Sequence, residues 1–458
     1  MKNQAFSSVD EPELRNLKVF FFLMAFLLIT DFVMPQYFGI HLGYDLTCIR
    51  LGDICIILYM IFNRKLFTHF CSTVMKQGIF IPIALYLLVA FYTMVLRTDL
   101  NAFFLVFFEM LTLLILLYGI RYVIGCSRAI RMIIGCAYFL SIYGMVEYVY
   151  GKSLFLQFLS TMPNNVANCY RSGHYRIMGP CGHPLGYGLL LLLFLAVASY
   201  DYERQEVYIF KRPLLFLLLI ANIFLTGSRS TLGIVFLEIA LLLVVSGKTN
   251  VKKSIFVLVI VVVVLALFLL LFQGTSVGRY MLMQLASLLD QLLGTQYAAL
   301  FGADVTTLHN SEAYREFLPR IFTLDWLNPF LGRGVSSSFS AEIEGIYIHS
   351  IDNYYVSQYI KYAYPGLVTY CIFIIGVVVM MVRECVIYHS NLSKVLLIAT
   401  VCYYVNLWWL DALQTLKFEY VIIALFFAEH AYHVQTSSRA CMSNELSKKI
   451  VTNDDKNM

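Results

Sequence analysis

The chain has 458 residues, of which 60% are hydrophobic and only 13% are charged, and its mean hydropathy is +0.74. Soluble domains carry roughly 25% charged residues, so this composition excludes an ordinary soluble protein and predicts an all-α protein that crosses a lipid bilayer many times. The net charge of +5 gives no reason to expect a nucleic-acid partner, because in membrane proteins the placement of Lys and Arg matters more than their total.

Apolar runs follow one another along the chain, and a transmembrane helix needs about 20 mostly apolar residues. The sequence predicts twelve spans, at residues 18–35, 46–62, 78–96, 102–120, 130–150, 183–200, 212–227, 230–246, 253–273, 351–382, 395–411 and 417–434. The tenth run is long and contains Pro365-Gly366, which predicts a kink at that point.

These spans divide the chain into five parts. A tail at 1–17 precedes nine spans over 18–273, a large polar loop occupies 274–350, three spans fill 351–434, and a polar tail that we expect to be disordered ends the chain at 435–458. Within the large loop, the segment MLMQLASLLDQLL has its leucines at helical spacing and predicts an amphipathic helix on the membrane surface. The segment SEAYREFLPRIFTLDWL predicts a second helix, which Pro319 interrupts.

The distribution of Lys and Arg predicts the orientation. If the N-terminus lies in the cytoplasm, the inside segments hold 21 of the 33 basic residues, and most of the other 12 lie in or beside two long outer loops. Cytoplasmic loops carry the excess of Lys and Arg, and long loops count little. We therefore expect both termini in the cytoplasm and the loops 151–182 and 274–350 on the outer side.

Three polar places interrupt the apolar pattern on that outer side. Arg176 and His183 flank a Gly- and Pro-rich entry into the sixth span, and Arg229 lies in a very short connection between two spans. Arg315 and Arg333 lie in the large loop. The planar guanidinium of Arg suits a phosphate, and a charged residue at membrane depth is costly and favours a functional role. We predict that these five residues bind an anionic substrate.

The large loop ends in three further polar candidates. His349 and Asp352 are the two candidates for a general base, and the choice between them stays open at this point. Asn353 is expected to hydrogen-bond a substrate or to orient a neighbouring side chain. The outer loops contain no DxD pair, no Cys/His set at metal-ligand spacing and no HExxH, so we predict no metal site and no cofactor.

Taken together, four motifs make the chain resemble the superfamily of O-antigen polymerases and O-antigen ligases, which includes Wzy-type polysaccharide polymerases. They are RIMGPCGHP at 176–184, TGSRS at 226–230, NPFLGRG at 328–334, and IDNYY at 351–355. Ligases usually have a His where this chain has Asp352, so the form seen here looks more like a polymerase. The resemblance covers roughly residues 120–385 and implies a GT-C-like membrane fold.

The resemblance also implies a substrate and a place of action. The substrate is an oligosaccharide linked to undecaprenyl diphosphate, and the nascent glycan is transferred from its lipid carrier to a new lipid-linked unit at the outer face of the bacterial plasma membrane. The expected activity is therefore that of a metal-independent glycosyltransferase in the synthesis of O-antigen, capsule or exopolysaccharide. Expected partners are the lipid bilayer, a flippase and a chain-length regulator.

Two alternatives stay open. A ligase of the same superfamily transfers the glycan to a different acceptor. A transporter of the lipid-linked oligosaccharide belongs to another class, and transporters often show internal repeats and broken helices at the membrane midplane. The chain shows no internal repeat, and its charges gather on one side, which favours an enzyme.

Overall fold

The computed structural model describes residues 11–157, 161, 170–171, 173–303, 314–348 and 350–454. His349, one of the two candidate bases, lies outside these residues, as does part of each predicted outer loop. The described chain is all-α apart from four short antiparallel hairpins. Their strands are β1 (Gly39–His41) with β2 (Asp45–Thr47), β3 (Tyr170–Arg171) with β4 (His174–Tyr175), β5 (Tyr200–Asp201) with β6 (Glu206–Val207), and β7 (Ala341–Ile343) with β8 (Ile346–Ile348).

Each of the twelve predicted apolar runs falls on a helix. These helices are α1 (Glu11–Val33), α2 (Cys48–Phe62), α4 (Phe80–Arg97), α5 (Leu100–Gly119), α6 (Cys126–Tyr150), α7 (Pro184–Ala198), α8 (Pro213–Thr226), α9 (Arg229–Val245), α10 (Lys248–Phe272), α13 (Tyr354–Ile387), α14 (Asn391–Asn406) and α15 (Leu416–Asp454). Inside a bilayer no water is present to bond the backbone, so a helix that pairs its own N–H and C=O groups is the structure expected of such runs.

By length and composition, five helices in the described part of the chain are able to cross a membrane. They are α4, α5 extended to Ile124, α6, α10 and α13, and a sixth span results if α2 and the following helix count as one. Helices α7 and α8 are apolar but shorter. These helices indicate a multi-pass membrane protein, and the count of twelve spans stays a prediction.

In the described part of the chain, α3 (Arg64–Met75) and α11 (Ser276–Leu293) are α-helices that connect or flank the apolar ones. Helix α3 follows α2 at an angle of 115°, and Asn63 both ends α2 and caps α3 by accepting the N–H of Leu66. Helix α11 confirms the amphipathic helix predicted in the large loop. The sharp turn between α2 and α3 was not predicted from the sequence.

The predicted kink near Pro365-Gly366 is confirmed, and it is larger than the sequence indicated. The break lies at Ala363, whose φ is +54°. Rings of Tyr354 and Tyr370 lie 5.4 Å apart between centroids, whereas sixteen residues of straight helix rise about 24 Å. The first piece of α13, from Tyr354 to Tyr362, therefore folds back beside the second piece.

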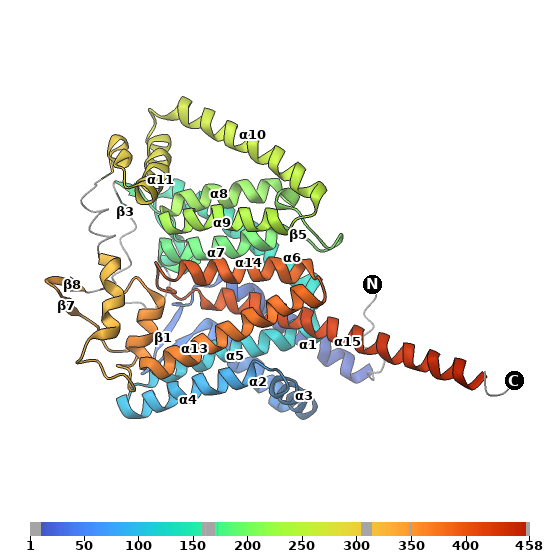
Figure 1. Ribbon diagram of the computed structural model, residues 1–458. Coiled ribbons are helices and arrows are strands. Elements are labelled where there is room, and N and C mark those ends of the chain that lie inside the picture. Colours follow the sequence, from blue (N-terminus) through green and yellow to red (C-terminus); the bar gives the residue numbers. More distant parts are fainter. Residues whose placement is uncertain are drawn as a thin grey trace.

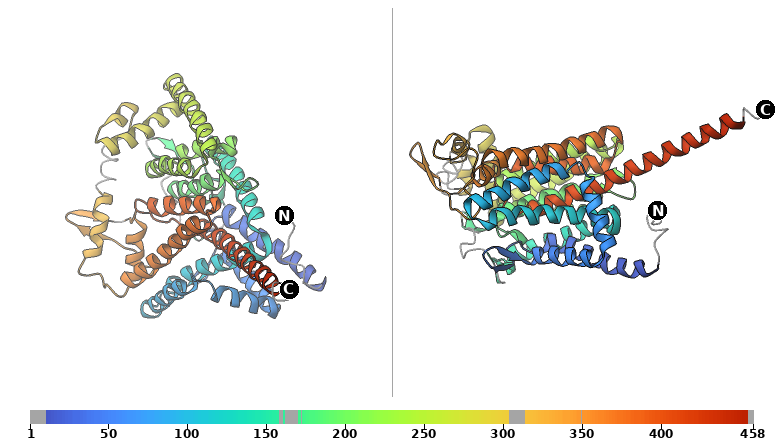
Figure 2. Two further views of the ribbon diagram at one scale, coloured as in Figure 1. Left: turned by 45° about the vertical axis from the view of Figure 1, so that its right-hand side comes forward. Right: turned by 90° about the horizontal axis from the view of Figure 1, so that it is seen from below.

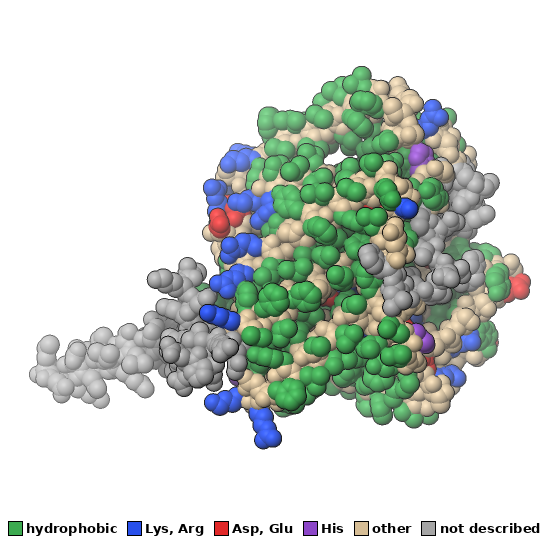
Figure 3. All heavy atoms as spheres, turned by 180° about the vertical axis from the view of Figure 1, so that it is seen from behind, with side chains coloured by type: hydrophobic (Ala, Val, Ile, Leu, Met, Phe, Trp, Pro, Cys, Tyr) green, Lys and Arg blue, Asp and Glu red, His purple; other side chains and the backbone are tan. Residues whose placement is uncertain are grey.

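The two ends of the bundle differ in composition. The start of α1 and the end of α15 lie at one end, which we call the tail end, while α11, β7 and β8 lie at the opposite end, which we call the loop end (Figure 1). Lys and Arg side chains gather at the tail end, with a broad hydrophobic surface between the two ends (Figure 3). This arrangement agrees with the excess of basic residues that cytoplasmic segments carry.

Two helices reach away from the packed bundle. Only 6% of the most apolar window of α10 is buried, so its side chains face outward, as lipid-exposed side chains do. Helix α15 continues past the bundle at the tail end, as Figure 1 and the right-hand view of Figure 2 show. The prediction of a disordered tail after residue 434 is wrong as far as Asp454, because the helix that begins at Leu416 runs on through that part.

Reporter insertions test the topology. Because the large loop and α15 lie at opposite ends of the bundle, reporters inserted after residues 310 and 445 are expected to report opposite sides of the membrane. A reporter in the turn between β5 and β6, after Glu203, is the control and is expected to report the same side as residue 445. The same side for residues 310 and 445 rules out this orientation.

Candidate functional site

A buried carboxylate holds the segment that carries Arg176. Glu147, near the end of α6, is 1% exposed. Its carboxylate accepts a hydrogen bond from the Tyr175 hydroxyl (2.9 Å) and from the backbone N–H groups of Met178 (2.9 Å) and Gly179 (3.0 Å). These donors lie on both sides of Arg176, so the carboxylate fixes the course of the chain around that residue.

Arg176 joins this segment to the connection between α8 and α9. It is 7% exposed, and its Nε donates to the carbonyl oxygen of Thr226 (2.7 Å). Gly227, the next residue, ends α8 with a φ of +61°, and a Cβ at this position would lie 3.0 Å from Arg176 Nε and 2.3 Å from the Tyr280 hydroxyl oxygen. Only glycine fits both that backbone conformation and that space.

Arg229 lies in the same corner of the bundle. It is the first residue of α9 and is 7% exposed. Ser228 caps this helix, because its Oγ accepts the N–H of Thr231. The Thr231 hydroxyl in turn accepts a hydrogen bond from the Asn406 amide at the end of α14 (3.2 Å). The first turn of α9, which begins with Arg229, is thereby tied to α14, and it follows directly on the α8–α9 connection that Arg176 contacts at Thr226.

His183 lies at the start of α7 between Arg176 and Asp352. Its Nδ1 accepts the N–H of Leu185 (3.1 Å), which caps the helix and leaves the ring proton on Nε2. Burial lowers the pKa of His183 to about 4; the positive charge of Arg176 acts in the same direction, and the carboxylate of Asp352 acts against it. His183 is therefore neutral near pH 7, and its Nε2–H is a hydrogen-bond donor.

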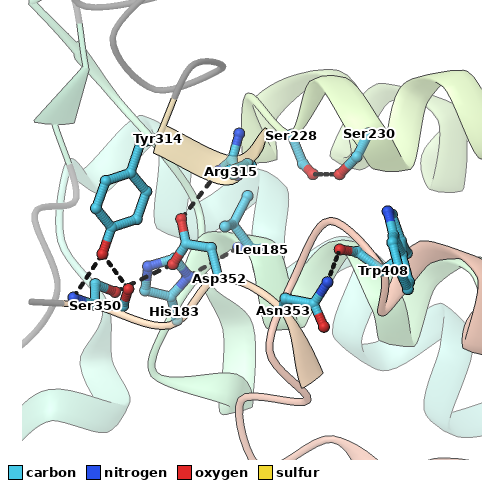
Figure 4. A network of polar contacts seen from close by, with 10 residues as sticks. All are labelled: His183, Leu185, Ser228, Ser230, Tyr314, Arg315, Ser350, Asp352, Asn353 and Trp408. Atoms are coloured by element: carbon cyan, nitrogen blue, oxygen red, sulfur yellow. Dashed lines mark hydrogen bonds and ion pairs between the residues drawn. The ribbon is translucent and has the colours of Figure 1, made fainter. Parts of the chain in front are cut away.

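Asp352 lies at the centre of a small polar network (Figure 4). Arg315 pairs with it through Nη2 at 3.1 Å from Oδ2, and the Ser350 hydroxyl donates to Oδ1 at 3.1 Å. Tyr314 holds Ser350 from the other side, because its hydroxyl accepts the Ser350 N–H (2.8 Å) and donates to the Ser350 carbonyl. The sequence did not predict that Arg315 would neutralise the candidate base.

Asn353 performs a structural role in this network. Its Oδ1 accepts the N–H of Val356 (3.0 Å), which caps α13, and its Nδ2 donates to the carbonyl oxygen of Trp408 after α14 (2.8 Å). The residue is 2% exposed. Asn353 therefore joins the start of α13 to the residues after α14, and its two predicted roles, in binding a substrate or orienting a neighbour, stay predictions.

Arg333 is placed differently from the other arginines. Its guanidinium lies over the rings of Trp326 (5.6 Å) and Phe339 (5.9 Å). Its backbone N–H donates to the carbonyl of Ile360 (2.8 Å), close to the break in α13. The structure thus places Arg333 among aromatic residues of the large loop, and its contacts are not with Arg176, Arg315 or Asp352.

Hydrogen bonds join the NPFLGRG motif and the two residues after it to the turn between α4 and α5. Arg97 Nε donates to the carbonyl of Gly332 (2.7 Å), and Asp99 accepts the N–H groups of Val335 (2.7 Å) and Ser336 (2.9 Å). Burial opposes the charge of Asp99, but the hydrogen bonds from Ser336, Val335 and Asn101 outweigh it and lower the pKa of Asp99. The motif therefore positions the end of the large loop.

Sequence reasoning missed Glu147, Tyr280 and Tyr314. A signal existed for Glu147, since an ionisable residue inside a predicted span favours a special role. Nothing in the sequence distinguishes Tyr280 or Tyr314 from the other tyrosines of this chain, because their importance comes from which residues the fold places beside them. In the part of the chain that the structure describes, no three His, Cys, Asp or Glu side chains are grouped as metal ligands would be.

The fold and the polar corner define an all-α, multi-pass membrane protein with Arg, His and Asp side chains gathered at the loop end. No protein-family model matches the chain, and no curated protein matches it significantly. Membership of the O-antigen polymerase and ligase superfamily therefore stays a prediction from the four motifs.

Replacement of Glu147 tests the support of the Arg176 segment. Glu147→Gln puts an NH₂ group where the carboxylate accepted hydrogen bonds, so at least one buried N–H loses its partner. We expect a loss of about 1–3 kcal/mol in stability, measured as a lower midpoint of thermal unfolding in detergent. Glu203→Gln is the matched control, because Glu203 is exposed in a turn. Equal midpoints for the two variants contradict the role of Glu147.

His183 gives a pH-dependent prediction. The pKa of His183 is lowered from 6.5 to about 4 in the folded protein, so between these values the unfolded chain binds more protons and the folded state loses stability as pH falls. His183→Asn keeps the helix cap but does not titrate. We expect the wild type to lose more stability than the variant between pH 7 and pH 4.5. Parallel stability–pH curves refute the proposed burial of a neutral His183.

Proposed function

We propose that this protein is a glycosyltransferase that polymerises a cell-surface polysaccharide, with twelve spans, both termini in the cytoplasm, and its site at the outer face of the bacterial plasma membrane. One observation carries the proposal: Arg176, His183 and the Arg315–Asp352 pair come from separate segments and lie near one another at the end of the bundle opposite to the basic tail end, on the side where Arg229 begins α9. A lipid-linked diphosphate at the membrane surface is a substrate suited to such a site.

The proposed reaction transfers the glycan from undecaprenyl diphosphate to the sugar of a new lipid-linked unit. A hydroxyl of the acceptor sugar attacks the anomeric carbon of the donor, and a C–O bond forms there while the bond from that carbon to the diphosphate oxygen breaks. The hydroxyl proton passes to the general base, and the lipid diphosphate leaves with the bonding electron pair. Buried arginines stabilise the charge that develops on this leaving group.

The Arg315–Asp352 pair suits the binding step of this reaction. Both side chains are partly exposed, at 23% and 34%, and an ion pair of this kind contributes only about 0–1 kcal/mol. An incoming diphosphate can therefore take Arg315 from Asp352 at little cost. The carboxylate released in this way becomes the acceptor for the hydroxyl proton, and His349 remains the alternative base.

The two fixed arginines have a different part in the proposal. Arg176 donates from Nε to the carbonyl oxygen of Thr226, which fixes the position of its planar guanidinium, a group whose shape suits a phosphate. Arg229 begins α9, and the N-terminal end of a helix itself favours an anion. The neutral His183 adds a donor without adding a charge that would have to be desolvated.

Substitution of the two fixed arginines tests the function. Arg176→Lys and Arg229→Lys keep the charge and lose the planar fork, and loss of such a contact typically lowers the rate about 10²–10³-fold. The assay uses purified protein, lipid-linked repeat units isolated from cells that make the polysaccharide, and excess chelator. Glycan chain length is measured on a gel. We expect long polymer from the wild type and none from either variant.

Controls separate this result from its alternatives. Arg279→Lys changes an exposed arginine of α11 and is expected to leave polymer length unchanged, while thermal midpoints check that every variant is folded. Asp352→Asn is expected to abolish polymer if Asp352 is the base and to spare it if His349 is. Normal polymer from both Arg176→Lys and Arg229→Lys refutes the proposed site. Transfer of glycan to a different acceptor identifies a ligase, and transport without transfer identifies a flippase.

A further inference from the structure

An apolar groove opens between α13 and α14 close to the candidate site. Its volume is about 460 Å³, within the range of pockets that bind small molecules. Tyr355, Val401, Tyr404 and Trp408 contribute to its walls. No charged side chain lines the groove, which excludes a sugar or a phosphate as its main occupant and favours a hydrocarbon chain.

A polar atom in the wall of the groove, the Tyr355 hydroxyl, is already hydrogen-bonded within the protein. The Tyr355 hydroxyl donates to the carbonyl oxygen of Tyr404 (2.9 Å), so the ring presents its apolar surface to the space. Trp408 and Trp409 close one end and are 49% and 37% exposed. Tryptophan is enriched where membrane hydrocarbon meets water, so this end of the groove is the one expected at the level of lipid head groups.

The same end of the groove is bonded to the polar site. The carbonyl of Trp408 accepts the hydrogen bond from Asn353, the neighbour of Asp352 (Figure 4). Asn406, two residues before Trp408, donates to Thr231 in the first turn of α9, which begins with Arg229. The Trp408 end of the groove is thus joined through Asn353 to the segment that carries Asp352, and Asp352 pairs with Arg315.

We propose that this groove binds the isoprenoid chain of a lipid diphosphate, with the diphosphate held at Arg315 and Arg229. The identity of the lipid rests on the proposed function. The charge pattern supports this occupant, since an apolar tail that ends in an anion matches an apolar groove with Arg315 beyond its Trp408 end. An ordinary phospholipid chain is the alternative that the experiment has to exclude.

Photo-crosslinking tests the groove without requiring turnover. The probe is an undecaprenyl diphosphate analogue with a diazirine in its isoprenoid chain, incubated with the full-length protein in lipid nanodiscs. Mass spectrometry maps the labelled peptides. We expect label on the segments that contain Tyr355 and Trp408, and we expect unlabelled undecaprenyl diphosphate to compete it away. The comparison probe is phosphatidylglycerol with a diazirine in its acyl chain.

A variant that fills the groove gives the matched test. Val405 lines the groove and is 38% exposed, so Val405→Trp adds bulk there without crowding the core. We expect it to lower labelling by the isoprenoid probe about tenfold, which corresponds to the loss of roughly two buried methylene groups. Val264→Trp is the control, because Val264 is 58% exposed on α10 and lies outside the groove.

Turnover gives an independent readout in the same variants. With the natural lipid-linked unit, Val405→Trp is expected to raise KM and to change kcat little, because binding of the tail is lost and not the chemistry. With a short-chain analogue that does not reach into the groove, wild type and variant are expected to have equal KM. A fall in kcat with both substrates overturns the inference, since it places Val405 in a general structural role.

The outcomes distinguish this inference from the proposed function. If the isoprenoid probe labels the groove but no polymer forms, the result supports binding of the isoprenoid chain in the groove and refutes the proposed polymerase function. If polymer forms but the groove is not labelled, isoprenoid binding in the groove is refuted and the polymerase function is retained. The same conclusion holds if polymer forms and the phospholipid probe labels the groove as strongly as the isoprenoid probe does. Equal labelling of Val405→Trp and wild type also refutes isoprenoid binding in the groove.

Discussion

The candidate site depends on the hydrogen bond from Arg176 Nε to the carbonyl oxygen of Thr226. It joins the segment before α7 to the connection between α8 and α9, and the backbone N–H of Ile177 supports this junction by donating to the carbonyl oxygen of Leu225 (3.2 Å). On one side of this bond, the buried carboxylate of Glu147 holds the chain around Arg176. On the other side, Gly227 leaves room for the guanidinium and Ser228 starts the helix that carries Arg229. The arginine is therefore both a structural tie and a source of positive charge.

The sequence was sufficient to predict where the apolar helices lie and where glycine- and proline-containing motifs interrupt them. Twelve apolar runs coincide with helices because a lipid environment leaves the backbone little choice. The backbone at Gly227 accepts only glycine, because its φ is +61° and Arg176 and Tyr280 lie close by. The kink in α13 follows from Pro365, which lacks a backbone N–H and crowds the preceding turn of the helix. The amphipathic spacing of α11 was also visible, because it depends only on residues that are neighbours along the chain.

What the sequence could not provide are the contacts between distant segments. The pairing of Arg315 with Asp352 and the hydrogen bond from Asn353 to Trp408 join residues that are 37 and 55 positions apart. No local pattern specifies such pairs, because they depend on how whole helices pack. The same reason explains why Arg333 looked like the other arginines in sequence, although the fold places it over Trp326 and Phe339. The sequence predicted a kink in α13 but not that its first piece folds back, because this geometry depends on packing against α4, a helix far away in the sequence.

The folded-back piece of α13 also determines when the protein becomes complete during synthesis. Gln358 in this piece accepts a hydrogen bond from Tyr86, 272 residues earlier in the chain, and Asn353 needs Trp408, which is made still later. A ribosome releases the chain from its N-terminal end onward, so the early helices enter the membrane with their side of the site unfinished. The contacts that position Asn353 and its neighbour Asp352 are therefore complete only after α14 and the residues that follow it have been made.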